Sequence, residues 1–308
     1  MAIKSITATI NGQTVTLTLN SSTGKYEAQV NAPAGSSFNL SGGYYPVSLR
    51  AEDTAGNVTN ADSSHSTLGE SLRLFVKEKV KPIITILAPS AGAYVTSGTP
   101  EIKFKVTDNT VQTSGYSGVK KDSCVLKIGS AAVDVSKITW EETEGGFIGT
   151  YTPEEALADG DQTITVDIQD NDGNSADTAS CTFKIDTVAP SLVVTAPAEG
   201  LETNKSELTV VGSTDDVTSK PVSISVKLNG KDCGEVTVDS DGSFSKVITL
   251  DQQGENVIVV TATDKAGKTT TVTRTVTYNT TAPVIKSVTI TPNPASAGSL
   301  YKIVVEVV

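Results

Sequence analysis

Leu49-Arg-Ala-Glu-Asp53-Thr-Ala-Gly56-Asn57 ends one segment of the chain, and two later segments end on the same pattern. They read Val166-Asp-Ile-Gln-Asp170-Asn-Asp-Gly173-Asn174 and Val260-Thr-Ala-Thr-Asp264-Lys-Ala-Gly267-Lys268. Each is an alternating strand, then Asp-x-x-Gly, then a strand rich in Thr and Ser. The aspartate can accept hydrogen bonds from backbone amides just ahead, and glycine tolerates the positive φ of a hairpin exit. We therefore predict a tandem array of one β module, with structural turn residues Asp53, Gly56, Asp170, Gly173, Asp264 and Gly267.

The spacing of this pattern divides the 308 residues into three modules and a remainder. Modules of roughly 90 to 110 residues have the size of a small β-sandwich. Composition agrees, because Thr, Val, Ile and Ser are abundant and no amphipathic helical stretch of three turns is present. We predict an all-β chain.

The third module is the most complete. Asn229-Gly230 is a strong two-residue hairpin signal within it. Its alternating segments predict seven strands, near 191–197, 207–211, 222–228, 235–239, 244–250, 256–263 and 270–278. Seven such strands make a sandwich of two sheets, and the second module repeats this plan with longer loops.

The joints between modules also repeat, as Lys81-Pro82, Val188-Ala-Pro190 and Thr281-Ala-Pro283. Proline fixes its own φ and holds the preceding residue extended, so short joints of this kind are stiff and predict an elongated rod. The predicted domains are residues 1–81, 82–189, 190–282 and 283–308.

The first module starts at what should be its third strand, and residues 283–308 supply only the first two strands of a fourth module. Two interpretations stay open. The chain is a portion of a longer protein or has a smaller first module, or the terminal strands of one copy complete the first module of the next by strand addition. The second interpretation predicts a homo-oligomer.

The net charge is −11 and Lys and Arg are scattered singly, so we expect no nucleic-acid partner, which would need a basic footprint. No apolar run is long enough to span a bilayer, so we expect no membrane insertion. The sequence opens on an alternating strand, Met1 to Ile10, without a basic and then apolar leader. We therefore expect assembly in the bacterial cytoplasm instead of export.

The sequence holds no convincing catalytic constellation. His65 is the sole histidine and lies in a polar loop, and the adjacent acids Asp215 and Asp216 are interpreted as solvated loop charges. We predict that the chain is not an enzyme and needs no cofactor. Tyr44, Tyr45 and Tyr116 lie in predicted loops and are the candidate surface-contact residues.

Calcium is the one metal that the turns suggest. A helix–loop–helix calcium loop counted from Asp170 needs Gly at 175 and a carboxylate at 181, where the chain has Ser175 and Cys181. A calcium site between modules, built from Asp167, Asp170 and Asp172, stays open beside the simpler interpretation of a self-capped hairpin turn.

The third module carries a family resemblance. Val226-Lys-Leu-Asn229-Gly230, Asp241-Gly242-Ser-Phe244 and Gly254-Glu-Asn256, followed by the Asp264 turn, resemble the bacterial immunoglobulin-like (Big-type) tandem repeats of phage virion proteins and bacterial surface proteins. Lys268 stands where this family usually has Asn, which weakens a metal role for that turn. The resemblance implies immunoglobulin-like sandwiches that serve as spacers, adhesive arms or decorations.

Together with the missing leader, the resemblance favours a non-catalytic structural component of a phage or phage-tail-like particle. Its modules would project from the tail, baseplate or capsid, contact other virion proteins and bind the host surface weakly. The alternative is a segment of an exported bacterial adhesin or cell-wall surface protein, which would be extracellular and bind a cell-surface glycan or protein.

Overall fold

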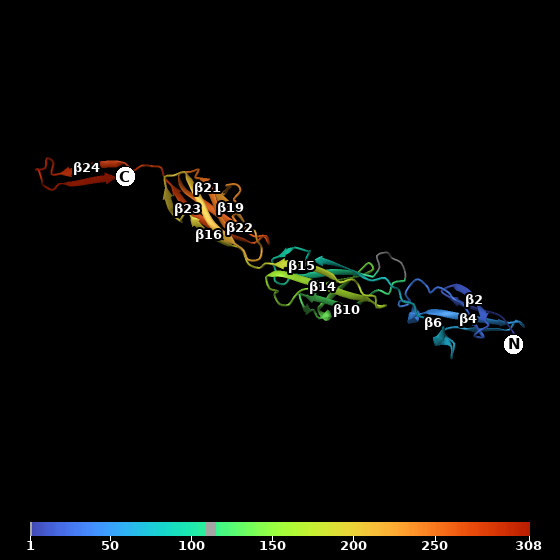
Figure 1. Cartoon of the computed structure of the whole chain (residues 1–308). Helices are drawn as coiled ribbons and strands as arrows, with labels where there is room; N and C mark the ends of the chain where they lie inside the picture. The colour runs from blue at the N-terminus through green and yellow to red at the C-terminus, as the bar shows by residue number, and fades with distance from the viewer. Residues whose placement is uncertain (1, 109–114) are drawn as a thin grey trace. The chain divides into compact units, whose positions relative to one another are not determined.

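The computed structural model describes residues 2–108 and 115–308. The chain forms two compact units, Met1–Ile185 and Asp186–Val308, and strands run through both (Figure 1). Helical structure in the described residues consists of three 3₁₀ turns, η1 (Ser41–Gly43), η2 (Gly69–Leu72) and η3 (Val135–Lys137). No described helix has the length and apolar character needed to span a bilayer.

The first six strands pair into one sheet, in the order β3-β2-β1-β4-β5 with β6 paired to β4. They are β1 (Ile3–Ile10), β2 (Gln13–Asn20), β3 (Lys25–Glu27), β4 (Tyr45–Asp53), β5 (Val58–Ala61) and β6 (Arg73–Leu74). β1 and β2 meet at Asn11-Gly12, where both residues have positive φ, 46° and 76°. This is the backbone that a two-residue hairpin requires.

The next strands form a sandwich of two sheets. One has the order β12-β13-β9-β7 and the other β11-β10-β14-β15-β8. The strands are β7 (Ile83–Ala88), β8 (Tyr94–Val95), β9 (Ile102–Thr107), β10 (Val119–Ile128), β11 (Ala131–Ala132), β12 (Thr139–Thr143), β13 (Gly146–Tyr151), β14 (Gly160–Asp170) and β15 (Ala179–Ile185). Alternate residues of β9 and β14 point inward, and Phe104, Val106, Ile164 and Val166 are almost fully buried between the sheets.

The second unit contains a sandwich with the same plan, with sheets ordered β16-β18-β21 and β17-β23-β22-β19-β20. Its strands are β16 (Ser191–Ala196), β17 (Leu201–Thr203), β18 (Glu207–Asp215), β19 (Ser223–Leu228), β20 (Lys231–Asp232), β21 (Ser243–Thr249), β22 (Gly254–Thr263) and β23 (Thr269–Tyr278). Val210, Val226, Phe244 and Val260 lie in its core. The short strand β17 pairs parallel to β23, as β8 pairs parallel to β15.

Both sandwiches fill their cores by the same device, a phenylalanine ring packed over a glycine. A Cβ atom at Gly149 would lie 2.5 Å from the ring of Phe104, and one at Gly212 would lie 2.5 Å from the ring of Phe244. The missing side chain makes room for the ring. The predicted fold class, all-β with tandem immunoglobulin-like β-sandwich modules, is confirmed, and the rod shape stays a prediction.

The last two strands, β24 (Ile285–Thr291) and β25 (Lys302–Val307), form a two-stranded antiparallel sheet. Their apolar side chains are exposed, including Val288, Ile290, Ile303 and Val305. Each described sheet lies inside one of the four predicted domains, and those domain boundaries stay a prediction.

Candidate functional site: two acidic triads

The three Asp-x-x-Gly turns share one backbone geometry. The amide of the fourth residue after each aspartate donates to its Oδ1, from Asn57 at 2.9 Å, from Asn174 at 2.8 Å and from Lys268 at 2.8 Å. The turn glycines Gly56, Gly173 and Gly267 have φ of 90°, 95° and 84°. Each turn is therefore closed by its own aspartate, and a side chain at the glycine would be strained.

The second carboxylate oxygen distinguishes the third turn from the other two. Asn57 Nδ2 donates to Asp53 Oδ2 at 2.9 Å, and Asn174 Nδ2 donates to Asp170 Oδ2 at 2.6 Å. Lys268 replaces this asparagine in the third turn, and Asp264 Oδ2 is buried without a hydrogen-bond partner.

Asp170 belongs to a cluster that we call the first acidic triad, with Glu78 and Asp108. All three residues are buried, and one carboxylate oxygen from each lies within 4.8 Å of the others. They come from three elements: Asp170 ends β14, Asp108 directly follows β9, and Glu78 lies in the segment that precedes β7. Only the folded sandwich brings these elements together.

The second unit contains an equivalent cluster, the second acidic triad, formed by Asp186, Asp216 and Asp264. Asp264 directly follows β22, and Asp216 directly follows β18. Asp186 lies four residues before Pro190, as Glu78 lies four residues before Pro82. The same three positions of the module are therefore acidic in both sandwiches.

Burial and mutual repulsion raise the pKa values of two carboxyl groups in the first triad. Burial, with a hydrogen bond to Asp170, raises the pKa of Glu78 to about 7. Burial and the charges of Asp170 and Asp172 raise the pKa of Asp108 to about 6, although the Gly118 amide donates to its Oδ2 at 2.6 Å. Asp108 Oδ1 is buried without a hydrogen-bond partner.

The segment that carries Glu78, residues 76–80, is called the strap below. It is hydrogen-bonded to the sandwich of β7 to β15. The amide of Glu78 donates to Asp172 Oδ2 at 3.0 Å, and Lys77 Nζ donates to the Asp172 carbonyl at 2.9 Å. Asn174 Nδ2 lies 3.2 Å from both Glu78 O and Glu78 Oε1. The triad therefore stands where the strap meets the turn that follows β14.

The calcium ligands suggested by the sequence, Asp167, Asp170 and Asp172, do not converge on one point as the triad residues do. Asp167 is three residues before Asp170 on β14, so its side chain points to the opposite face, where the Thr178 hydroxyl donates to it. Asp172 borders the triad through the Glu78 amide. The structure thus places Asp170 with Glu78 and Asp108, and the set of Asp167, Asp170 and Asp172 does not form one cluster.

Four triad members were missed by the sequence reasoning: Glu78, Asp108, Asp186 and Asp216. The interpretation of Asp216 as a solvated charge was wrong, because it is 6% exposed and its Oδ1 accepts from the Thr218 and Ser219 amides at 2.8 and 2.6 Å. The sequence offered a signal for Glu78 and Asp186, because each lies four residues before a joint proline, Pro82 or Pro190.

The candidate contact tyrosines lie in the first unit and are half-buried. Tyr44 packs edge-on against Phe75 with ring centroids 6.1 Å apart, and the Arg73 guanidinium lies 5.0 Å from the Tyr44 ring centre. Tyr45 donates its hydroxyl to the Gly35 carbonyl at 3.2 Å. Tyr44 and Tyr45 line one surface hollow of about 670 Å³.

Tyr116 lies apart from that hollow. Its backbone carbonyl accepts from Asn39 Nδ2 at 2.8 Å, where the loop after β3 touches the loop before β10. His65 closes a turn through its Nδ1, to which the Thr67 and Leu68 amides donate at 3.3 Å.

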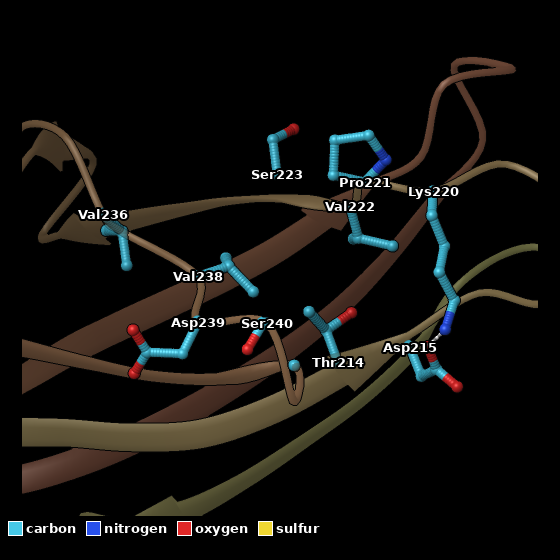
Figure 2. A pocket seen from close by; sticks show the side chains of 11 residues that line it. Thr214, Asp215, Lys220, Pro221, Val222, Ser223, Val236, Val238, Asp239 and Ser240 are labelled. Atoms are coloured by element: carbon cyan, nitrogen blue, oxygen red, sulfur yellow. Dashed lines mark ion pairs between the residues drawn. The ribbon is translucent and has the colours of Figure 1, made fainter.

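A second surface hollow, of about 360 Å³, is lined in part by Asp215, the residue before the triad member Asp216 (Figure 2). Figure 2 shows Val222, Val236 and Val238 around it, with an ion pair between Lys220 Nζ and Asp215 Oδ1 at 2.6 Å. Both charged side chains are mostly exposed, so the pair contributes little energy.

Two family models match parts of the chain. Residues 96–187 match the bacterial Ig-like domain, and residues 190–280 match domain B of glucodextranase. No curated protein matches the chain.

Solved structures of several modular proteins are similar to it. The fibronectin(III)-like modules of CbhA from Clostridium thermocellum are 17% identical, with a TM-score of 0.38, covering 64% of this chain and 94% of that one. A bacterial ice-binding adhesin is 18% identical over 91% of this chain and 88% of that one, with a TM-score of 0.31. SGBP-B from the mixed-linkage glucan utilization locus of Bacteroides ovatus, in complex with a mixed-linkage heptasaccharide, is 15% identical over 97% of this chain and 69% of that one, with a TM-score of 0.22. A shared fold does not specify a function.

Proposed function

We propose that the chain is a non-catalytic structural component of a phage or phage-tail-like particle, with immunoglobulin-like modules projecting from the tail, baseplate or capsid. The observation that carries this proposal is the repetition of one sandwich, with the same triad positions and a glycine–phenylalanine contact in each core. A repeated module of this kind suits a spacer.

The arrangement of the acids supports a non-catalytic role. No triad residue lines the hollow beside Tyr44 or the hollow beside Lys220. A catalytic carboxylate must reach a substrate in a cleft, whereas these carboxylates are buried.

The runner-up function is a segment of an exported bacterial adhesin or cell-wall surface protein, and the same modules suit it. In either setting, Tyr44 and Tyr45 would form a weak contact with a surface glycan or protein, because the half-exposed rings flank a hollow that also holds polar side chains.

The exposed hairpin of β24 and β25 favours a further strand-mediated contact. Its two strands pair with each other, and their apolar faces are open to solvent. A homo-oligomer formed by strand addition would cover them.

Electron microscopy with gold-labelled antibody against the chain tests the proposal in the producing bacterium and in particles released from it. Label on regular projections of a tail or shell supports the virion role. Label confined to the cell envelope, with unlabelled particles, would replace it with the adhesin role.

A further inference from the structure

We propose that each acidic triad is a binding site for one hard divalent cation, with calcium the preferred ion, so that the chain binds two. The sites are Glu78, Asp108 and Asp170, and Asp186, Asp216 and Asp264. This inference does not rest on the proposed function, since it concerns the modules in any setting.

Charge balance is the first argument. Three carboxylates gather within 4.8 Å in each triad, and all six residues are buried. None of the described ion pairs engages Glu78, Asp108, Asp170, Asp216 or Asp264. A buried charge is costly unless it is paired or coordinates a metal.

An unpartnered oxygen in each triad is the second, independent argument. Asp108 is 3% exposed and Asp264 is 7% exposed, and Asp108 Oδ1 and Asp264 Oδ2 are buried without a hydrogen-bond partner. Buried polar atoms are satisfied in the great majority of cases. A cation would supply the missing partner in both sandwiches at once.

The first module provides an internal contrast. Asp53 occupies the same turn, but its Oδ1 and Oδ2 both accept hydrogen bonds, from the Asn57 amide and from Asn57 Nδ2. Among the described residues, Asp53 belongs to no cluster of three acids. The turn alone therefore does not create the site, and the two further acids do.

The donor atoms select the class of ion. Each triad offers carboxylate oxygens, which suit Ca²⁺, Mg²⁺ and Mn²⁺ better than the softer metals that thiolate and imidazole bind. Calcium accepts six to eight oxygens in flexible geometry, whereas magnesium demands a near-ideal octahedron and keeps its waters. Three side chains from three separate elements favour the less demanding ion.

The position of Glu78 gives the first site a mechanical consequence. A cation held by Glu78, Asp108 and Asp170 would tie the strap to both sheets of the sandwich of β7 to β15. Lys77 and Lys79 in the strap are trypsin sites, whereas Lys81 precedes Pro82 and is not cleaved by trypsin. Calcium should therefore slow tryptic cleavage after Lys77 and Lys79.

Isothermal titration of the chelator-treated full chain with Ca²⁺ in about 0.15 M salt tests the stoichiometry, because salt screens diffuse binding to the acidic surface. We expect two ions per chain. Asp108→Asn and Asp216→Asn should each lower this to one and the double variant to none, because Asn retains an acceptor oxygen and removes the charge. Asp167→Asn, on the opposite face of β14, is the matched control and should still bind two.

A measurement on the unaltered chain keeps the proposal testable if a variant misfolds. Substoichiometric Mn²⁺ should broaden the amide resonances of Gly118, Asn174, Ser219 and Lys268, which lie beside the triads, and should leave Asn57 sharp. Uniform broadening, or broadening of Asn57 to the same degree, would mean diffuse binding and would overturn the proposal.

Protons are the competing occupants of the triads. If Ca²⁺, Mg²⁺ and Mn²⁺ all leave the melting temperature and the trypsin pattern unchanged, while acidification alone stabilises the sandwiches, the triads are proton-sharing clusters and the cation sites do not exist.

Discussion

Replacing Lys268 with asparagine should stabilise the sandwich of β16 to β23 in the absence of divalent cations. The first two turns show what the new residue would do, because Asn57 and Asn174 donate from Nδ2 to the second oxygen of their aspartates at 2.9 and 2.6 Å. In the third turn that oxygen, Asp264 Oδ2, is buried and unpartnered. Lys268→Asn places the same amide in the same turn.

Two opposing effects set the size of the expected change in the free energy of unfolding. A hydrogen bond to a charged group contributes about 1.5–3 kcal/mol. The lost lysine charge, which is half-exposed near three acids, costs about 0–1 kcal/mol. The net gain is about 0.5–3 kcal/mol, and in a module of this size about 1 kcal/mol raises the melting temperature by roughly 4–8 °C.

Differential scanning calorimetry of the full chain in EDTA measures this change. Lys265→Asn is the matched control, because it removes a lysine from the same turn and places an asparagine where the second turn has Asn171. We expect the third-module transition to rise in Lys268→Asn and not in Lys265→Asn. No rise in Lys268→Asn would refute the conclusion that the orphaned oxygen of Asp264 destabilises the cation-free module.

Three further outcomes follow from the structure. Gly212→Ala should cost about 1–3 kcal/mol, seen as a lower denaturant midpoint, because its Cβ would lie 2.5 Å from the Phe244 ring and 2.3 Å from the Val193 carbonyl oxygen; an unchanged midpoint would show that both the ring and the backbone at Val193 shift at little cost. In EDTA, the sandwich of β7 to β15 should lose stability as pH rises from about 4 to about 7. The raised pKa values of Glu78 and Asp108, about 7 and about 6, make the folded chain bind more protons than the unfolded chain in that window. Melting temperatures that stay flat or rise with pH would contradict this. Asp53→Ala should lower the melting temperature of the first sheet alone, since its carboxylate closes that turn; a matching loss in both sandwiches would mean that the modules do not unfold independently.

Much of the fold was readable from the sequence because its signals are local. Alternation along residues 256–263 predicts the inward set that includes Ile258 and Val260, and β22 buries both. Asn229-Gly230 predicts a tight hairpin, and the two residues have φ of 52° and 82°. Local patterns of this kind act over a few residues and need no knowledge of the rest of the chain.

The candidate site was only partly readable. Asp170 and Asp264 were singled out because their turns repeat. The partners of Asp170, Glu78 and Asp108, lie 92 and 62 residues away, and those of Asp264, Asp186 and Asp216, lie 78 and 48 residues away. Asp215 and Asp216 are adjacent, and nothing local says that the first is exposed and the second buried. Which acids converge depends on where each strand ends in the sandwich.

The sequence by itself determined the repeating β pattern, most of the longer strands and the self-capped turns, because period-two alternation and Asp-x-x-Gly chemistry operate between near neighbours. The strand predicted near 235–239 is present only as isolated bridges at Val236 and Val238. Only the tertiary structure decided which carboxylates share one buried space. Stacking two sheets brings the ends of β9 and β14, or of β18 and β22, beside the entering joint segment. The resulting crowding of three acids arises from that packing alone, because electrostatic coupling depends on distance in space and on burial.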